Sequence, residues 1–286
     1  MKGIILAGGS GSRLYPVTKV YSKQLAIIYD KPLIYHPLSS LMLGGIRDIL
    51  IISNEETIPL YRQLFEDGSR IGLSVNYAVQ KAPNGIAEAF IIGEEFINNE
   101  SVTLVLGDNI FYGNFNFFYN ALKANEYATI FGYRVTDPQR YGIVEFDKEG
   151  NAISIEEKPK VPKSDFAVPG IYIYNNEVVN IAKNLKPSAR GELEITDVNK
   201  EYLMHKKLKV EKIGRGIAWL DTGTPEALLQ AANFFGVIEQ RQGLKVACIE
   251  EIAYRMKFIG KEQFAALTAS YPKSSYRDYL EKLINE

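Results

Sequence analysis

The stretch that decides the fold lies at the N-terminus and reads Lys2-Gly3-Ile4-Ile5-Leu6-Ala7-Gly8-Gly9-Ser10-Gly11-Ser12-Arg13. Its first six residues predict a short buried β-strand that runs straight into a glycine-rich loop. Glycines after a strand let backbone N–H groups turn toward an anion without interference from a Cβ atom. Arg13 adds a cation whose forked donors suit phosphate. The pattern predicts a triphosphate-binding loop at the start of an α/β domain.

This loop differs from two well-known phosphate-binding motifs. A P-loop requires Gly-Lys-Ser/Thr after four intervening residues, which this chain lacks. A dinucleotide fingerprint requires a third glycine where this chain has Leu14. The alternative interpretation is an ordinary turn, since glycine clusters after strands often form one. Arg13 and the unusual Leu14-Tyr15-Pro16 that follows favour the phosphate-binding interpretation.

Composition excludes several classes of protein. The chain has 286 residues, 46% of them hydrophobic, and a formal net charge of −1 from 33 basic and 34 acidic residues. Without a basic excess, neither nucleic acid nor an anionic membrane is indicated as a partner. One cysteine, Cys248, and two histidines exclude an internal disulfide, a cysteine-based zinc cluster and a multi-histidine metal site. No run reaches the roughly 18 apolar residues of a membrane span, and no signal peptide is recognisable, so we expect a soluble cytoplasmic protein.

Short apolar runs alternate with helical patterns over the first half of the chain. Strands are predicted at 48–53, 101–108 and 128–133, and helices at 37–43, 58–65 and 86–96. Strand–helix alternation with strands that are apolar on both faces favours a mostly parallel sheet covered by helices on both sides. We therefore predict an α/β fold with a Rossmann-like, mostly parallel mixed sheet flanked by helices.

The pattern changes after about residue 133. The segments 142–146 and 152–156 flank a turn at 147–150 and predict a β-hairpin, while 170–174 alternates as a strand does. This central region is therefore expected to be more antiparallel than the first half. We expect it to form a second lobe that shares the main sheet.

The C-terminal part of the chain has helical patterns. Thr224 at the N-cap, Pro225 at the first helical position and an acidic residue next predict a helix that runs to about Ile238. We predict one large domain over residues 1–240 and a C-terminal helical region over residues 241–286 that packs on it.

Two aspartates follow apolar strands and are candidate metal ligands. Asp108 ends Leu106-Gly107-Asp108, and Asp221 ends Ala218-Trp219-Leu220-Asp221. Ligands of open α/β sheets gather at the carboxyl ends of strands. Mg²⁺ prefers a few carboxylates together with phosphate oxygens. The alternatives are a strand-ending aspartate that caps a turn for Asp108 and a helix-entry turn for Asp221.

Two lysines lie in motifs that make them candidates for phosphate contacts. Lys23 follows the glycine loop in Ser22-Lys23-Gln24, and Lys158 lies in Glu156-Glu157-Lys158-Pro159. A lone lysine is nearly always a solvated surface charge, so each is of interest only through its neighbours. Glu157 beside Lys158 suits a ligand that offers hydroxyls on one side and a phosphate on the other.

The ordered set of motifs resembles the sugar-1-phosphate nucleotidylyltransferases over nearly the whole chain. The motifs that carry the resemblance are Leu6–Pro16, Ser22–Gln24, Tyr29–Pro32, Gly107–Gly113, Arg140–Gly142, Glu156–Pro159, Arg190–Asp197 and Ala218–Thr224. Each is modestly specific alone, but all of them in this order make chance an untenable explanation. The long form Gly-Asp-Asn-Ile-Phe-Tyr-Gly at 107–113 is similar to the thymidylyl-transferring branch.

The resemblance implies a role for particular residues. It assigns the nucleotide to Gly8, Gly9, Ser10, Gly11, Ser12, Arg13, Gln24, Gln80 and Gly85, and Mg²⁺ to Asp108 and Asp221. It assigns the sugar phosphate to Asn109, Tyr141, Gly142, Glu157, Lys158, Val168 and Tyr172. Arg13, Lys23, Asp108, Lys158 and Asp221 would then be catalytic. About 1–133 would form the nucleotide-binding part and about 134–223 the sugar-binding part.

The resemblance also implies a reaction and its regulation. The expected reaction is Mg²⁺-dependent thymidylyl transfer from dTTP to α-D-glucose 1-phosphate, which gives dTDP-glucose and pyrophosphate for dTDP-rhamnose or related deoxysugar biosynthesis. Members of this branch form homotetramers with a second nucleotide-sugar site, where a downstream dTDP-sugar inhibits. Its residues here would be Tyr112, Gly113, Arg215, Gly216 and Arg255. Ordinary surface turns are the alternative interpretation of these residues.

The chain departs from the family pattern at three positions. Ile27 stands where relatives usually have a proline, which would have fixed φ in the segment that carries Lys23. Ser12 replaces a common threonine, and His36 stands where many relatives have tyrosine. None of these changes removes a candidate catalytic group. Uridylyl or cytidylyl transfer, a non-catalytic sugar-nucleotide-binding subunit and a scaffold protein remain the alternatives.

Overall fold

The computed structural model describes residues 1–9 and 11–285. Its strands are β1 Lys2–Leu6, β2 Ile27–Ile28, β3 Lys31–Pro32, β4 Asp48–Ser53, β5 Ser74–Val79, β6 Val102–Leu106, β7 Asn109–Tyr112, β8 Ala128–Arg134, β9 Gly142–Phe146, β10 Ala152–Glu157, β11 Phe166–Ala167, β12 Ile171–Tyr174, β13 Leu208–Lys212 and β14 Ala218–Asp221. Its helices are α1 Tyr35–Leu43, α2 Ile58–Phe65, α3 Glu88–Ile92, α4 Glu94–Ile97, α5 Asn116–Ala124, α6 Glu177–Asn184, α7 Ile195–Met204, α8 Pro225–Gln242, α9 Ile249–Arg255, α10 Lys261–Ser270 and α11 Ser275–Ile284. None of these helices is long and apolar enough to cross a bilayer.

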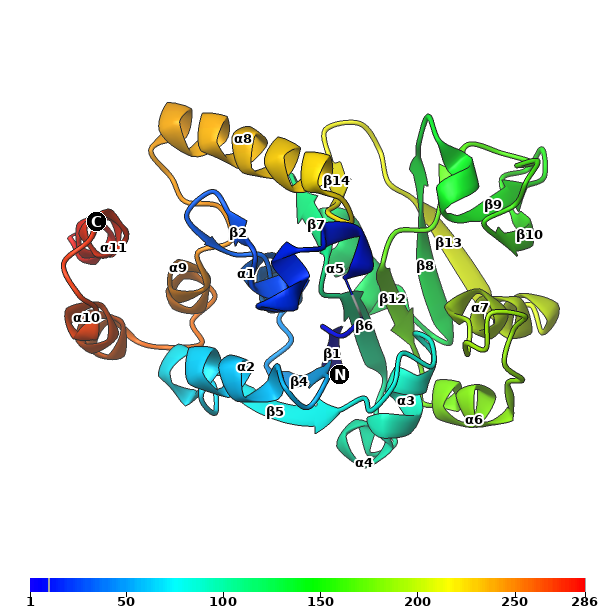
Figure 1. The fold of residues 1–286 in the computed structure, drawn as a ribbon, viewed down its shortest axis with the longest axis horizontal. Helices are drawn as coiled ribbons and strands as arrows, with labels where there is room; N and C mark the ends of the chain where they lie inside the picture. Colours follow the sequence, from blue (N-terminus) through cyan, green and yellow to red (C-terminus); the bar gives the residue numbers. More distant parts are fainter. Residues whose placement is uncertain (10, 286) are drawn as a thin grey trace.

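A ten-stranded mixed sheet runs through the molecule with helices on both sides, as Figure 1 shows. Its order is β10-β9-β11-β8-β12-β6-β1-β4-β5, with β13 also paired to β8. The four strands β6, β1, β4 and β5 are parallel to one another, and β1 lies between β6 and β4. The predicted α/β fold is confirmed, and the N-terminal strand occupies the middle of the parallel part.

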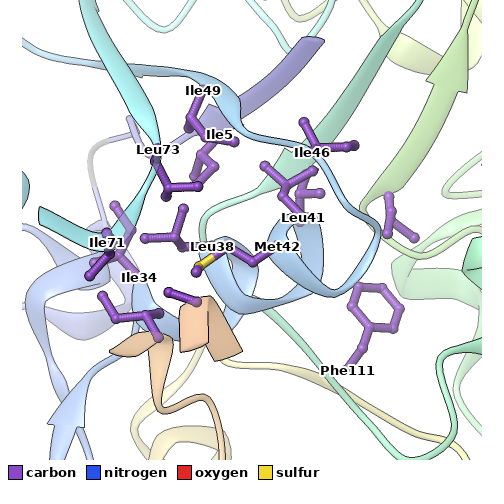
Figure 2. Close-up of a cluster of buried hydrophobic side chains, with 14 of the residues drawn as sticks. Ile5, Ile34, Leu38, Leu41, Met42, Ile46, Ile49, Ile71, Leu73 and Phe111 are labelled. Atoms are coloured by element: carbon purple, nitrogen blue, oxygen red, sulfur yellow. The ribbon is translucent and has the colours of Figure 1, made fainter. Parts of the chain in front are cut away.

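Adjacent residues of β1 pack into opposite layers of the core. Ile5 belongs to the cluster that Figure 2 shows, where Leu38 and Met42 of α1 cover this face of the sheet. Ile4 belongs to the cluster on the other face with Phe90 of α3. Both isoleucines are fully buried because side chains alternate across a strand whose two faces are covered. The end of β1 is therefore held rigidly where the glycine loop begins.

Several predicted elements have their predicted bounds, and others differ. β4, α2 and the first hairpin strand β9 are confirmed to the residue. The single helix predicted at 86–96 is wrong, because Gly93 divides it into α3 and α4. Helix α8 runs beyond Ile238 and ends where Gly243 adopts a left-handed φ of 69°, a common helix stop.

The central region is antiparallel, as predicted. β12 pairs antiparallel with both β6 and β8, and β9 and β10 form the expected hairpin. β13 was not predicted and pairs parallel with β8. β14 lies outside the main sheet and forms a two-stranded sheet with β7. Consequently Asp221 reaches the end of the parallel strands on a separate ribbon.

The C-terminal helices lie at one end of the molecule and the β9–β10 hairpin at the other (Figure 1). α9 packs against α1, and α10 and α11 pack against each other and on α9. The helices expected in the C-terminal region are thus present and touch the body. The boundary at residue 240 and the division near residue 133 stay predictions.

Candidate active site

Two adjoining cavities lie at the carboxyl ends of β1 and β6. The larger has a volume of about 690 Å³ and the smaller about 220 Å³. Four residues line both: Ile86, Leu106, Asp108 and Glu192. The cavities are therefore two ends of one cleft, and Asp108 lies where they meet. This is the position at which open α/β sheets bind ligands.

The glycine loop forms one wall of this cleft. Gly8 and Gly9 line the smaller cavity, and Ser12 and Arg13 line the larger. Gly9 and Gly11 have φ values of 101° and 56°, which glycine adopts without strain. Ser10, the remaining predicted loop residue, lies outside the described part of the chain. The described loop thus spans both ends of the cleft.

Three of the predicted nucleotide-binding residues, Gln24, Gln80 and Gly85, lie together at the smaller end. Gln24 and Gln80 are 3% and 7% exposed. Gln24 donates through Nε2 to the Gly8 carbonyl at 3.2 Å, and Ser22 donates to its Oε1 at 2.6 Å. Gln80 donates through Nε2 to the Gly85 carbonyl at 3.2 Å and to Glu88 at 2.8 Å. Both amides are therefore held in fixed orientations beside the glycine loop.

Asp108 carries an ion pair with Lys23 at the junction of the two cavities. Burial alone would raise the pKa of Asp108, but the charge and hydrogen bond of Lys23 and the Asn109 amide hold that pKa below its ordinary value. Burial raises the pKa of Asp221, and the neighbouring charge of Asp108 raises it further. The two aspartates therefore lie close enough to repel each other.

The β7–β14 ribbon brings these aspartates together. Asp221 lies opposite Asn109 in the ribbon. Asn109 directly follows Asp108 in the sequence, so the pairing brings Asp221 close to Asp108. Thr222 donates its hydroxyl to the Asp108 carbonyl at 2.8 Å and its backbone N–H to the same oxygen at 3.2 Å. Among the described residues no group of three or more histidine, cysteine, aspartate or glutamate side chains could hold a metal. A cation here would have two carboxylates from the protein, which leaves positions for water and phosphate.

The predicted sugar-phosphate residues all line the larger cavity. Among them, Glu157 has two polar contacts: its Oε2 accepts from Thr196 at 2.5 Å, and its Oε1 lies 3.5 Å from Lys158 Nζ. A Cβ on Gly142 would lie 3.2 Å from Glu157 Oε2, so a glycine leaves room for this carboxylate. Lys158 has a φ of 43°, which is uncommon for a residue with a side chain.

Asn109 has internal partners for both ends of its amide. Its Oδ1 accepts from the Gly170 backbone at 2.9 Å and from Trp219 Nε1 at 2.6 Å. Its Nδ2 donates to Asp108 Oδ1 at 2.9 Å. Asn109 is 4% exposed, so its main contribution in this structure is to orient Asp108 and Trp219 at the cavity wall.

Sequence reasoning missed several residues that line the larger cavity. They are Arg140, Arg190, Glu192, Thr196, Asn199 and Trp219. Arg140 lies 3.7 Å from Asp221, and Arg190 donates to both oxygens of Glu194 and lies 3.8 Å from Glu157. Both arginines stand in motifs recognised in the sequence, next to a glycine or a Tyr-Gly pair. An arginine within two residues of a glycine, as at the N-terminal loop, was the available signal.

The residues predicted for a second site lie in two places within one chain. Gly113 and Gly216 are in contact, since a Cβ on Gly113 would lie 2.6 Å from the Gly216 carbonyl oxygen. Tyr112 lies opposite Ala218 in the β7–β14 ribbon, so Arg215 is nearby along the chain. Arg255 is on α9 and pairs with Glu251 at 2.6 Å. Figure 1 shows α9 well apart from this ribbon.

The fold and cleft define a class of enzyme that sequence comparison confirms. The chain belongs to the nucleotidyl transferase family, whose profile matches residues 2–250. It is 54% identical over 290 residues to the glucose-1-phosphate thymidylyltransferase of Neisseria gonorrhoeae, with 100% of both chains covered. It is 52% identical over 288 residues to the enzyme of the same name from Mycolicibacterium smegmatis, covering 100% of this chain and 99% of the relative.

Solved structures agree with this placement. A Bacillus anthracis protein described as a glucose-1-phosphate thymidylyltransferase matches with a TM-score of 0.77 and 42% identity, over 82% of this chain and 94% of that one. A UDP-glucose pyrophosphorylase matches with a TM-score of 0.74 at 22% identity, over 83% of this chain and 98% of that one, which shows the shared fold. The resemblance found in the motifs is confirmed: this chain is a nucleotidyltransferase.

Proposed function

We propose that this enzyme transfers the thymidylyl group of dTTP to α-D-glucose 1-phosphate and releases pyrophosphate. The observation that carries the proposal is the shape of the cleft. Its smaller end holds two fixed glutamine amides beside the glycine loop, and its larger end holds Glu157 and Lys158. Asp108 lies between them, where two phosphorylated substrates would meet. The names of the full-length relatives support the choice of substrates.

The chemistry at this junction requires positioning and charge more than proton transfer. The attacking oxygen of a sugar 1-phosphate is already an anion at neutral pH, so the reaction needs no general base. The described residues that line the cleft include no histidine, in keeping with this. The obstacle is repulsion between two polyanions. Arg13 and Lys158 offset it, and Lys23 stabilises the charge that develops on the α-phosphate during in-line displacement.

Asp108 and Asp221 fit a bound Mg²⁺. They are neighbouring carboxylates, and the raised pKa of Asp221 reflects burial together with like-charge repulsion that a divalent cation would relieve. When bound, Mg²⁺ would neutralise phosphate oxygens as a Lewis acid. Lys23 pairs with Asp108 in this structure, so its ammonium stands beside the place where the α-phosphate would lie.

The orientation of Gln80 favours thymine or uracil over cytosine. The Glu88 carboxylate accepts the hydrogen bond from Gln80 Nε2, which leaves Oε1 as the acceptor near Gly8. Thymine and uracil offer an N3–H donor, whereas neutral cytosine has an acceptor at N3. Thymine differs from uracil by one methyl group, worth roughly 1 kcal/mol when buried. We therefore expect dTTP to be preferred, UTP to be used less well and CTP to be poor.

We also propose a homotetramer with a second nucleotide-sugar site, and one contact within the chain supports this. The contact between Gly113 and Gly216 assembles two of the five residues expected at a second nucleotide-sugar site. Arg255 would have to come from another subunit, which accords with a site between subunits of a homotetramer. A downstream dTDP-sugar would bind there as an inhibitor. The cytoplasmic location and the deoxysugar pathway stay predictions.

A substrate panel tests the proposed reaction. Pyrophosphate release is measured with dTTP, UTP, CTP and ATP, each paired with glucose 1-phosphate and galactose 1-phosphate, with and without MgCl₂. We expect the highest kcat/KM for dTTP with glucose 1-phosphate and no turnover after chelation of divalent ions. A tenfold preference for UTP or CTP over dTTP would overturn the nucleotide assignment. An absence of pyrophosphate release with every pair would favour a binding subunit.

A further inference from the structure

The guanidinium of Arg13 lies directly on Gly223. A Cβ atom at position 223 would be 2.8 Å from one terminal nitrogen of Arg13, 3.1 Å from its Cζ and 3.2 Å from the other terminal nitrogen. Three atoms of one planar group at nearly equal distances indicate that the guanidinium rests on the glycine. Position 223 therefore has no room for a side chain while Arg13 holds this place.

Arg13 has few other restraints on its side chain. Within the part of the chain that the structure describes it makes no hydrogen bond or ion pair, although the Asp221 carboxylate is near enough for the two charges to interact. Its backbone is fixed, because Leu14 is buried and Thr18 donates to the Gly11 carbonyl at 3.0 Å. The contact with Gly223 thus limits where the guanidinium can go and leaves its N–H donors available for a phosphate.

Hydrogen bonds hold the segment around Gly223 on both sides. Thr222 is fully buried and bonds twice to the Asp108 carbonyl. Thr224 caps α8 by accepting from the Ala227 backbone at 3.2 Å. Asp221 is held in the β7–β14 ribbon. Gly223 does not lie at a positive φ, so alanine there creates no backbone strain. An added Cβ would instead push aside the flexible end of Arg13.

We infer that Gly223 is a positioning residue: its missing side chain sets the place of the Arg13 guanidinium in the cleft. The inference rests on the proposed role of Arg13 at the nucleotide phosphates. It joins two motifs more than 200 residues apart in sequence. The glycine after Asp221 is then required by a close approach of another side chain and not by the turn in which it stands.

A double-mutant cycle tests this inference with the full-length enzyme. Gly223→Ala, Arg13→Ala and the double variant are compared with wild type for kcat, for KM of dTTP and of glucose 1-phosphate, and for thermal unfolding. Gly260→Ala is the matched control, because its Cβ would meet only Glu262 at an ordinary 3.5 Å. We expect Gly223→Ala to lose about 10²-fold in kcat/KM for dTTP through misplacement of Arg13, with an unfolding midpoint near that of wild type.

The double variant distinguishes this mechanism from a general structural effect. We expect Gly223→Ala to have no further effect, within about twofold, once Arg13 is alanine, since coupled sites are non-additive. A second full loss in that background, wild-type kinetics in Gly223→Ala, or a markedly lowered unfolding midpoint would each overturn the inference. Near-normal kinetics in Arg13→Ala would instead show that Arg13 has no role at the phosphates, and the proposed function would lose that residue.

Discussion

Thr222 and the carbonyl oxygen of Asp108, 114 residues apart in sequence, are joined by two hydrogen bonds of 2.8 and 3.2 Å. Thr222 is fully buried, so water does not compete for these bonds. They fix the segment that carries Asp221 to the segment that carries Asp108. The carboxylate of Asp108 and that of Asp221 are thereby set by the backbone. This arrangement explains how two weakly specific Asp motifs become one site.

Thr222→Val should loosen this connection without a large change in side-chain shape. The variant keeps the hydrogen bond from the backbone N–H of residue 222. The Asp108 carbonyl, however, loses the hydrogen bond from the Thr222 hydroxyl. We expect a loss of about 1 kcal/mol in unfolding free energy and a clear fall in kcat. Chemical denaturation and steady-state kinetics measure the two effects. Thr222→Ser, which keeps the hydroxyl, is the control, and equal activity of both variants would contradict the role of this bond.

Asp108→Asn and Asp221→Asn should each abolish most Mg²⁺-dependent turnover in a folded protein. Each removes a negative charge from the junction of the two cavities, and the expected loss is on the order of 10²-fold or more. Activity is measured as pyrophosphate release over a range of MgCl₂ concentrations. Near-normal turnover in either variant removes that aspartate from the proposed metal site.

The same two variants should differ in sign in their effect on the stability of the metal-free protein. The pKa of Asp221 is raised by burial, so its ionised form is unfavourable in the folded state. The contribution of Asp221 to the free energy of unfolding therefore falls as pH rises through its folded pKa. The pKa of Asp108 is lowered despite burial, so its ionised form stabilises the folded state. This contribution to the free energy of unfolding is present above the unfolded pKa of Asp108 and is lost as pH falls through its folded pKa.

We therefore expect Asp221→Asn to raise and Asp108→Asn to lower the unfolding midpoint at pH 7 in the presence of a chelator. The two differences should shrink as the pH falls into the acidic range, where the wild-type carboxyls become protonated. Thermal unfolding from pH 3 to pH 8 provides the measurement. A stabilising Asp108→Asn would show that the ion pair with Lys23 does not offset the cost of burial.

Lys158→Ala should harm the use of sugar phosphate more than the binding of nucleotide. Lys158 lies beside Glu157 at the larger end of the cleft, away from Gln80 and Gln24. We expect a raised KM for glucose 1-phosphate and an unchanged equilibrium affinity for dTTP. Lys160→Ala, a nearby exposed lysine outside the cleft lining, should resemble wild type. An equal loss for both substrates would show that Lys158 is wrongly placed.

Arg215→Ala should relieve inhibition by a downstream dTDP-sugar while sparing basal kcat. Arg215 precedes Gly216, which contacts Gly113, and the expected coupling between the sites is 1–3 kcal/mol, a typical value. Inhibition kinetics on wild type and variant, with dTTP varied, separate the mechanisms. Purely competitive inhibition that is the same in both proteins would leave only product inhibition at the active site.

The predictable parts of this protein are those with local signals. The strands on either side of β1, which are β4 and β6, are apolar runs in the sequence. β4 and α2 were located to the residue from such a run and from helical spacing. β13 was missed because its Leu208-Lys209-Val210-Glu211-Lys212 alternation is short and largely polar. The prediction of a single helix at 86–96 was wrong because Gly93 interrupts a stretch whose apolar residues otherwise have helical spacing.

The sequence by itself determined which chemical groups are available: a glycine loop with Arg13, two strand-ending aspartates, and lysines in specific motifs. Only the tertiary structure decided how they meet. The β7–β14 pairing places Asp221 beside Asp108, Arg13 comes to rest on Gly223, and Arg140 and Arg190 enter the cleft. These are long-range contacts set by packing and backbone pairing, and no local pattern of residues encodes which distant partner a strand or a side chain will meet.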